Sequence, residues 1–209
     1  MDNVQFQKNG LQNRNIIKTP TGNSYLTLPV FSKSNSLINE VNITNKIYIK
    51  KILKSLKQNY AKSKYFDVVF DNINELVINK NYIKLHELNK DLIILSLNLM
   101  NAEVDIKFSS DFNLSSKKDD LVLELILSLK QNKYIMGPGG LNYMNLNKFT
   151  KNDIKLYKYK FNYKNYNQLW PKIGFVKNLS IIDLLFNELE SAKDYILSNG
   201  KLELLKDYK

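Results

Sequence analysis

The stretch Lys133-Tyr134-Ile135-Met136-Gly137-Pro138-Gly139-Gly140 predicts a short β-strand that ends in a glycine-rich turn. Further along, residues 154–163 alternate in polarity and predict a second strand. Apolar residues recur at helical spacing around these strands, over residues 49–60, 66–77, 85–99, 121–129 and 180–198. Strands interspersed with helices predict an α/β fold, with a single domain and a mixed sheet flanked by helices.

Further strands are predicted over Ser24–Val30 and Val104–Phe108. Residues 13–22 are polar and end in the turn signal Thr19-Pro20-Thr21-Gly22, so this segment reads as a loop. Asn199-Gly200 is a typical stop for the last helix. We therefore expect one domain over residues 1–200 and a C-terminal tail over 201–209.

Composition excludes several kinds of chemistry. The 209 residues include no Cys, which rules out thiol nucleophiles and Cys-ligated metals. The single His, His86, rules out a two-His metal site, and we predict no metal site. The polar N-terminus and the absence of an apolar run of about 18 residues predict a soluble, cytoplasmic protein without a membrane span. No cofactor can be identified from these residues.

The formal charge of +11 favours anionic ligands in general. Arg14 is the only Arg, and the heavy use of Lys, Asn, Ile and Tyr is what an AT-rich genome would impose. The aromatic and lysine residues of segment 157–164 would lie on opposite faces of a strand, which fits a half-buried strand better than a base-stacking surface. A nucleic-acid partner is therefore disfavoured, and a small anionic substrate is the preferred partner.

Polar residues near the N-terminus form the first candidate site. They are Gln5, Lys8, Asn13, Arg14 and Lys18. A lone Arg with two Lys nearby can hold a diphosphate or a carboxylate, because the guanidinium offers paired donors. The alternative is a solvated loop.

The glycine-rich turn is the second candidate. Backbone N–H groups at Gly137, Gly139 and Gly140 can face an anion, with Tyr143 close by in the sequence. The spacing matches neither a dinucleotide-binding fingerprint nor a P-loop. The alternative is a tight turn that needs positive φ angles.

The third candidate lies at the start of the last predicted helix. Ser180 followed by Asp183 resembles a capping box, while a cleft location would make Asp183 a general base or a hydroxyl binder. Asn187 falls on the same helix face, four residues on. Gln168 is a further polar candidate for ligand contact.

Taken together, these stretches resemble the WbqC-like family of bacterial proteins, which is associated with surface-polysaccharide (O-antigen) gene clusters. The residues that carry the resemblance are Asp2–Phe6, Asn13–Asn15, Lys18–Gly22, Leu26–Val30, Asn59-Tyr60, Tyr65-Phe66, Leu88-Asn89, Gly137–Gly140 with Tyr143, and Leu179–Asn187. The family usually has a further strand before the position of Asp2, so the resemblance implies an N-terminally short member.

The resemblance implies transfer of an acyl or aminoacyl group to an aminosugar carried by a nucleotide. In this interpretation the cations Lys8, Arg14 and Lys18 hold the diphosphate or a carboxylate, and Asp183 is the catalytic base. The other candidates named above supply ligand contacts. Two alternatives stay open, a non-catalytic module that binds a sugar nucleotide and a polyanion or nucleic-acid binder. The sugar, the donor and the oligomeric state are not fixed by the sequence.

Overall fold

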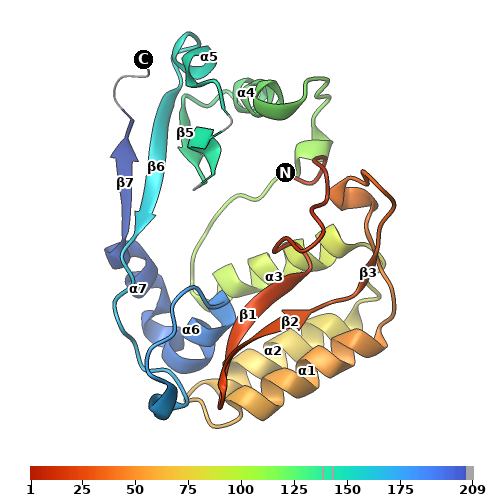
Figure 1. Cartoon of the computed structure of the whole chain (residues 1–209), viewed down its shortest axis with the longest axis vertical. Coiled ribbons are helices and arrows are strands. Elements are labelled where there is room, and N and C mark those ends of the chain that lie inside the picture. Colours follow the sequence, from red (N-terminus) through yellow and green to blue (C-terminus); the bar gives the residue numbers. More distant parts are fainter. Residues whose placement is uncertain (138, 143, 206–209) are drawn as a thin grey trace. The chain divides into compact units, whose positions relative to one another are not determined.

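A computed structural model describes residues 1–137, 139–142 and 144–205. Their contacts group into two compact units, and Figure 1 shows both. The helical unit comprises residues 2–105 and 165–194, and the sheet unit comprises residues 106–164 and the chain from 195 on, with Met1. The chain contains both helices and strands, including a mixed sheet, which confirms the predicted mixed α/β class.

Most elements of the helical unit precede residue 105. They are β1 (Arg14–Thr19), β2 (Gly22–Thr27), β3 (Val30–Phe31), β4 (Asn42–Ile43), α1 (Ile47–Tyr60), α2 (Phe66–Asn79), α3 (Leu85–Leu99) and the later α6 (Ile181–Glu188). Strands β1 and β2 form an antiparallel hairpin, and β3 pairs with β4. Short 3₁₀ turns cover Ile38–Glu40, Pro171–Ile173 and Leu189–Ser191.

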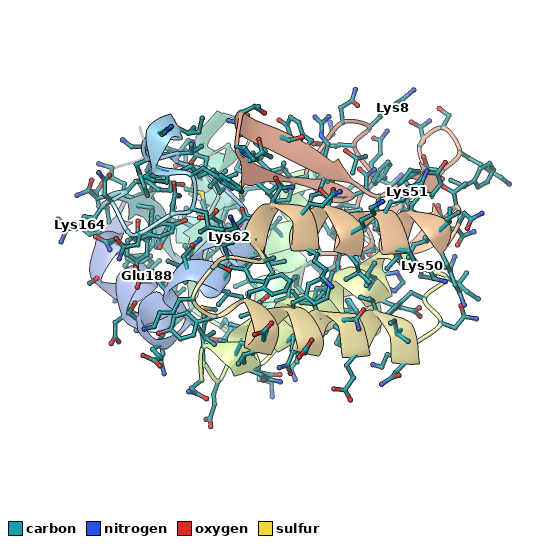
Figure 2. All side chains as sticks on the ribbon, turned by 90° about the horizontal axis from the view of Figure 1, so that it is seen from below. Lys8, Lys50, Lys51, Lys62, Lys164 and Glu188 are labelled. Atoms are coloured by element: carbon teal, nitrogen blue, oxygen red, sulfur yellow. The ribbon has the colours of Figure 1, made fainter. Side chains whose placement is uncertain are left out.

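The three predicted helices before residue 100 are confirmed as α1, α2 and α3. Helix α1 buries Leu53, Leu56 and Tyr60 on one face, which is the spacing that the sequence pattern predicts. Helices α1 and α2 lie side by side and antiparallel, as Figures 1 and 2 both show. A core cluster that includes Val41 and Leu85 joins α1 and α3 to the strands.

The β1–β2 hairpin corrects the prediction of a polar loop over residues 13–22. The turn signal is confirmed, since the pairing ends at Thr19 and Gly22, where φ is +130°. The strand was missed because one of the buried side chains of β1 is charged. Ile17 and Lys18 are both about 1% exposed, and a Lys does not count as a core residue in an apolar pattern.

The sheet unit is built around a three-stranded mixed sheet. Its elements are α4 (Lys118–Ser128), β5 (Lys133–Met136), α5 (Leu146–Thr150), β6 (Lys155–Phe161) and β7 (Gly200–Leu204), with short turns at Ser109–Asp111 and Gly140–Asn142. Strand β6 pairs in parallel with β5 and antiparallel with β7. One face of the sheet packs through Met136 and Leu156 on α4 and α5. This confirms the mixed sheet with flanking helices.

Three sequence expectations differ from the structure. Val104–Phe108 pairs with no strand among the described residues, and Val104 is 61% exposed. The helix predicted over 180–198 is interrupted, with α7 (Ala192–Asn199) following a 3₁₀ turn. Gly200–Leu204 forms strand β7 where a tail was expected, because Leu202 and Leu204 pair with the aromatic residues of β6. The domain bounds over 1–200 stay a prediction.

Candidate functional site

A pocket of about 860 Å³ lies beside the start of β1 in the helical unit. Its walls come from residues 5–9, from Asn13 and Arg14, and from most of residues 27–35. We call it the Arg14 pocket. The structure thus brings four of the predicted ligand-binding residues, Gln5, Lys8, Asn13 and Arg14, to one cavity.

The Arg14 pocket has a strongly positive lining. Lys8, Arg14 and Lys33 are its charged residues, and no Asp, Glu or His is among the described residues that line it. Side-chain amides and hydroxyls make up most of the remaining surface, and Phe31 adds an aromatic ring that is 59% exposed. Such a lining suits a ligand that combines negative charge with hydroxyl groups and a flat ring.

Arg14 is held in place without using up its donors. One terminal nitrogen, Nη2, donates to the backbone carbonyl of Asn9, and the guanidinium lies 4.5 Å from the centre of the Tyr25 ring. Asn9 has a φ of +68°, a left-handed conformation that Asn tolerates better than most residues. Arg14 Nε is buried and has no hydrogen-bond partner among the described residues. The side chain is therefore oriented by Nη2, and Nη1 is the terminal nitrogen without a partner among the described residues.

Two walls of the pocket are joined directly. Phe6 N–H donates to the Ser36 carbonyl at 2.8 Å, and Gln5 Nε2 donates to Asn35 Oδ1 at 2.9 Å. The backbone N–H of Lys33 donates to Ser36 Oγ at 2.9 Å, which fixes the turn that carries this lysine. These bonds join the N-terminal segment to the turn that carries Lys33.

A second group of predicted residues lies in a buried polar cluster formed by Lys18, Tyr60, Tyr166 and Asp183. Asp183 on α6 is fully buried, and its two carboxylate oxygens accept hydrogen bonds from Tyr60 Oη and Tyr166 Oη, both at 2.7 Å. Lys18 Nζ donates to the Gly174 carbonyl at 2.6 Å. Every one of these groups belongs to the helical unit.

Burial controls the electrostatics of this cluster. Loss of water raises the pKa of Asp183, although the two tyrosine hydroxyls and Lys18 act in the opposite direction. Burial lowers the pKa of Lys18 more than the nearby Asp183 charge raises it. The pKa of Tyr60 is raised strongly by burial and then by Asp183. A buried, hydrogen-bonded group of this kind holds elements together, and it can do acid–base chemistry only where a ligand reaches it.

The segment from Tyr166 to Val176 covers this cluster, and its only regular element is the short 3₁₀ turn Pro171–Ile173. Gln168 joins the two ends of this segment. Its Nε2 donates to the Val176 carbonyl at 3.0 Å, and its Oε1 accepts from Val176 N–H at 2.9 Å. Trp170 and Gly174 have φ angles of +61° and +74°. Gln168 therefore shapes the loop over the cluster.

The structure separates the two interpretations of Ser180 and Asp183. Ser180 caps α6, where its hydroxyl accepts from Ile182 N–H, but its own backbone N–H donates to the Ile16 carbonyl of β1. Asp183 does not close a capping box, because its carboxylate binds the two tyrosines. Asn187 Nδ2 donates to the Asp183 backbone carbonyl at 2.7 Å, so this amide is committed within the helix.

The predicted glycine turn follows β5 in the sheet unit. Gly140 N–H donates to the Gly137 carbonyl at 3.0 Å, which confirms a turn. Gly137, Gly139 and Gly140 lack left-handed φ angles, so positive φ does not explain the choice of glycine. A Cβ on Gly137 or Gly139 would meet no atom of the described residues within 4 Å. Tyr143 lies outside the described residues.

A model of the WbqC-like protein family matches residues 1–195. The chain belongs to this family. A relative from Mycobacterium tuberculosis with the name "Uncharacterized protein Rv1507c" is 28% identical over 198 residues, which cover 93% of this chain and 85% of the relative. No solved structure matches the chain. Among the described residues of this WbqC-like protein, no helix is both long and apolar enough to cross a membrane.

The candidate residues of this WbqC-like chain thus occupy distinct places. Gln5, Lys8, Asn13 and Arg14 line the Arg14 pocket, while Lys18 and Asp183 are buried in the polar cluster, with Gln168 and Asn187 bonded nearby. Lys33, Tyr60 and Tyr166 were not predicted as site residues, although Asn59-Tyr60 is among the stretches that carry the resemblance. Tyr60 fits the apolar face of its helix, so the sequence pattern does not reveal a role for its hydroxyl. Lys33 lies in a short polar turn, where the sequence does not distinguish it from other surface lysines.

Proposed function

We propose that this protein binds a nucleotide-activated sugar in the Arg14 pocket and transfers an acyl or aminoacyl group to the amine of that sugar. The proposed binding rests on the lining of the pocket. Lys8, Arg14 and Lys33 all line it, and the described lining residues include no carboxylate. A diphosphate carries negative charge on several oxygens, and an oriented guanidinium with two ammonium groups matches it.

Other parts of the pocket suit the rest of such a ligand. Gln5 and Asn35 also line the pocket, and the bond between their amides leaves Gln5 Oε1 and Asn35 Nδ2 for sugar hydroxyls. Phe31 offers a face for a base or a sugar ring. Asn13 contributes less through its side-chain nitrogen, because Nδ2 already donates to the Leu28 carbonyl at 2.9 Å.

The transfer step follows from the resemblance to proteins of surface-polysaccharide synthesis. The sugar nitrogen forms a bond to the acyl carbon, the bond from that carbon to the donor's leaving group breaks, and the nitrogen loses a proton. Asp183 is proposed as the group that accepts the proton. Because it is fully buried, this role requires the cover around Gln168 to move away. The glycine turn of the sheet unit, with Tyr143, is proposed as a separate anion-binding segment.

A non-catalytic sugar-nucleotide-binding module is the second candidate. It is favoured by the absence of Asp, Glu and His from the described lining of the pocket, which leaves no proton acceptor beside a bound sugar. Both candidates predict the same ligand class. They differ in whether a bound aminosugar is modified.

Thermal unfolding with UDP-, dTDP-, GDP- and CMP-sugars tests the binding. A ligand at a hundred times its dissociation constant adds about 2.7 kcal/mol to the free energy of unfolding, which is roughly 5 to 10 °C in Tm for a chain of this length. We expect one nucleotide to give this shift and Arg14→Ala to abolish it. The absence of a shift with all four would contradict the proposal.

Mass spectrometry then distinguishes the two candidates. The stabilising nucleotide, carrying an aminosugar, is incubated with the protein and with acyl thioesters or activated amino acids as donors. A mass gain equal to the acyl group, lost in Arg14→Ala, supports transfer. Tight binding without any mass gain supports the non-catalytic module. Weak binding to every polyanion, with steep salt dependence, would instead indicate the polyanion alternative.

A further inference from the structure

The outer faces of α1 and α2 carry rows of opposite charge. Lys50, Lys54 and Lys57 are exposed along α1, and no acidic residue occurs between Val41 and Phe66. The exposed row on α2 is Asp67, Asp71 and Glu75, and α2 contains no basic residue. In Figure 2 the two helices lie next to each other, with Lys50 and Lys51 near one end of α1 and Lys62 beyond the other end.

These charges have no ion-pair partner within the described part of the chain, either across the two helices or elsewhere. Their spacing of three or four residues places each row along one helix face. Each row ends in an exposed apolar residue at the same end of the antiparallel pair, Ile47 on α1 at 51% exposure and Ile78 on α2 at 63%. Counted from this end, each helix therefore presents one exposed isoleucine followed by a row of charged residues.

We propose that this face binds a second copy of the chain. A twofold axis parallel to the helices places α1 of one copy against α2 of its partner, with these two helices antiparallel. In that register Ile47 meets Ile78 of the partner subunit. Lys50 then lies opposite Glu75 of the partner subunit, and Lys54 opposite Asp71 of the partner subunit. Because the interface has twofold symmetry, each contact between α1 of one copy and α2 of the partner occurs twice.

The charge pattern favours a second copy over other partners. A nucleic acid or an anionic membrane that covered both helices would meet the acidic row of α2 and be repelled there. The alternative twofold axis, perpendicular to the helices, would set the lysines of α1 against one another. Only the parallel axis pairs every row with its opposite and brings Ile47 and Ile78 of the partner subunit together.

The size of the face determines the strength that we expect. Each helix has 14 residues and is about 21 Å long at 1.5 Å per residue. Two adjacent helices give a footprint at the low end of specific interfaces. The contacts are mainly between charged groups at a surface, so added salt weakens them. We therefore expect a dimer that dissociates in the micromolar range and at high salt.

Sedimentation equilibrium of the full chain, across the micromolar range at low salt, measures this association. Two charge-reversed variants are compared with the natural chain, Lys50→Glu/Lys54→Glu and Asp71→Lys/Glu75→Lys. A fourfold variant combines all four changes. The matched control reverses two exposed lysines outside α1 and α2, Lys172→Glu/Lys177→Glu, and circular dichroism checks that every variant folds.

The expected result is a dimer for the natural chain, the control and the fourfold variant, and a monomer for each charge-reversed variant alone. An equimolar mixture of the two monomeric variants forms a heterodimer, because one then carries two acidic helices and the other two basic ones. A natural chain that stays monomeric overturns the proposal, and so does a dimer that persists in each of the two charge-reversed variants alone. Binding of duplex DNA or anionic vesicles by a monomeric chain, lost in Lys50→Glu/Lys54→Glu, overturns it in favour of an anionic partner. None of these results depends on the proposed ligand.

Discussion

The hydroxyl group of Tyr60 connects the backbone of Lys18 to the carboxylate of Asp183. It accepts a hydrogen bond from Lys18 N–H at 3.0 Å and donates one to Asp183 Oδ2 at 2.7 Å. These three residues lie on α1, β1 and α6, and all three are at most 1% exposed. One buried phenol thus satisfies a donor on a strand and an acceptor on a helix, which ties three elements of the helical unit together.

Tyr60→Phe is therefore expected to destabilise the protein by about 2 to 4 kcal/mol, since it leaves Lys18 N–H and Asp183 Oδ2 without this partner. Tyr166→Phe is the matched control, because it removes another hydroxyl from the same carboxylate. Tyr166 is only half-buried, and its hydroxyl donates to Asp183 Oδ1, so the expected loss is about 1 to 2 kcal/mol. Chemical denaturation measures both free energies of unfolding. Equal losses for the two variants would contradict the double role of Tyr60.

Lys18 predicts a pH dependence of stability. Burial lowers its pKa in the folded chain below the ordinary value of 10.5. Between the folded pKa and 10.5 the unfolded chain therefore binds more protons, so the free energy of unfolding rises with pH in this window. The contribution is complete above 10.5 and is lost as the pH falls through the folded pKa.

Lys18→Met removes this dependence while it keeps the volume of the side-chain stem. Denaturation at several pH values from neutral to about 10 compares the two chains, and the natural chain should gain at most about 1.4 kcal/mol per pH unit relative to the variant. Parallel curves would mean that Lys18 keeps its ordinary pKa in the folded protein. Lys177→Met serves as the control, since Lys177 is exposed.

The sequence predicted the elements whose buried face is apolar throughout. Leu53, Leu56 and Tyr60 repeat at helical spacing along α1. Strand β6 was predicted from its alternating aromatic and lysine residues, although Tyr159 on the aromatic face is 40% exposed and the buried Leu156 lies on the opposite face. Strand β1 was not predicted, because its inward side chains include Lys18, whose charge is compensated only by residues that arrive from elsewhere in the chain. Strand β7 was missed for the related reason that its partner, β6, is about 40 residues away.

Four of the predicted ligand-binding residues share the Arg14 pocket, and their arrangement could not be read from the sequence. The short polar segment from Gln5 to Arg14 folds onto itself, so its residues share a pocket. Lys18 is only four residues beyond Arg14, but β1 carries it toward Asp183, and strand geometry spreads four residues over about 13 Å. Lys33 enters the pocket through the turn at residues 33–36, and its position depends on pairing with residues 4–6 that no local pattern reveals.

Gly200 offers a test of the β6–β7 pairing in the sheet unit. A Cβ at this position would lie 2.5 Å from Tyr159 Oη and 2.9 Å from Cε2 of the same ring. Gly200→Ala should therefore destabilise the chain by about 1 to 3 kcal/mol, as overpacking does. In the Tyr159→Ala background the same change should cost much less, because the obstructing ring is gone. A double-mutant cycle by chemical denaturation measures the coupling, and additive losses would show that the ring simply moves aside.

Lys33 is expected to contribute to ligand affinity as a residue that the sequence did not single out. It shares the Arg14 pocket with Lys8 and Arg14, and its turn is fixed by Ser36. A charged hydrogen bond to a phosphate oxygen contributes about 1.5 to 3 kcal/mol, so Lys33→Gln should weaken binding of the stabilising nucleotide about 10- to 100-fold with little change in Tm of the free protein.

Lys177→Gln is the matched control for this measurement, since it removes the same charge from an exposed position of the helical unit outside the pocket lining. Titration calorimetry at fixed ionic strength compares the two variants. A long-range effect of net charge would weaken binding equally in both, and high salt would remove the difference from the natural chain. A direct contact weakens binding only in Lys33→Gln, and the loss persists in salt. If both variants bind like the natural chain, the phosphates do not reach Lys33, and the ligand would have to lie nearer Lys8 and Arg14.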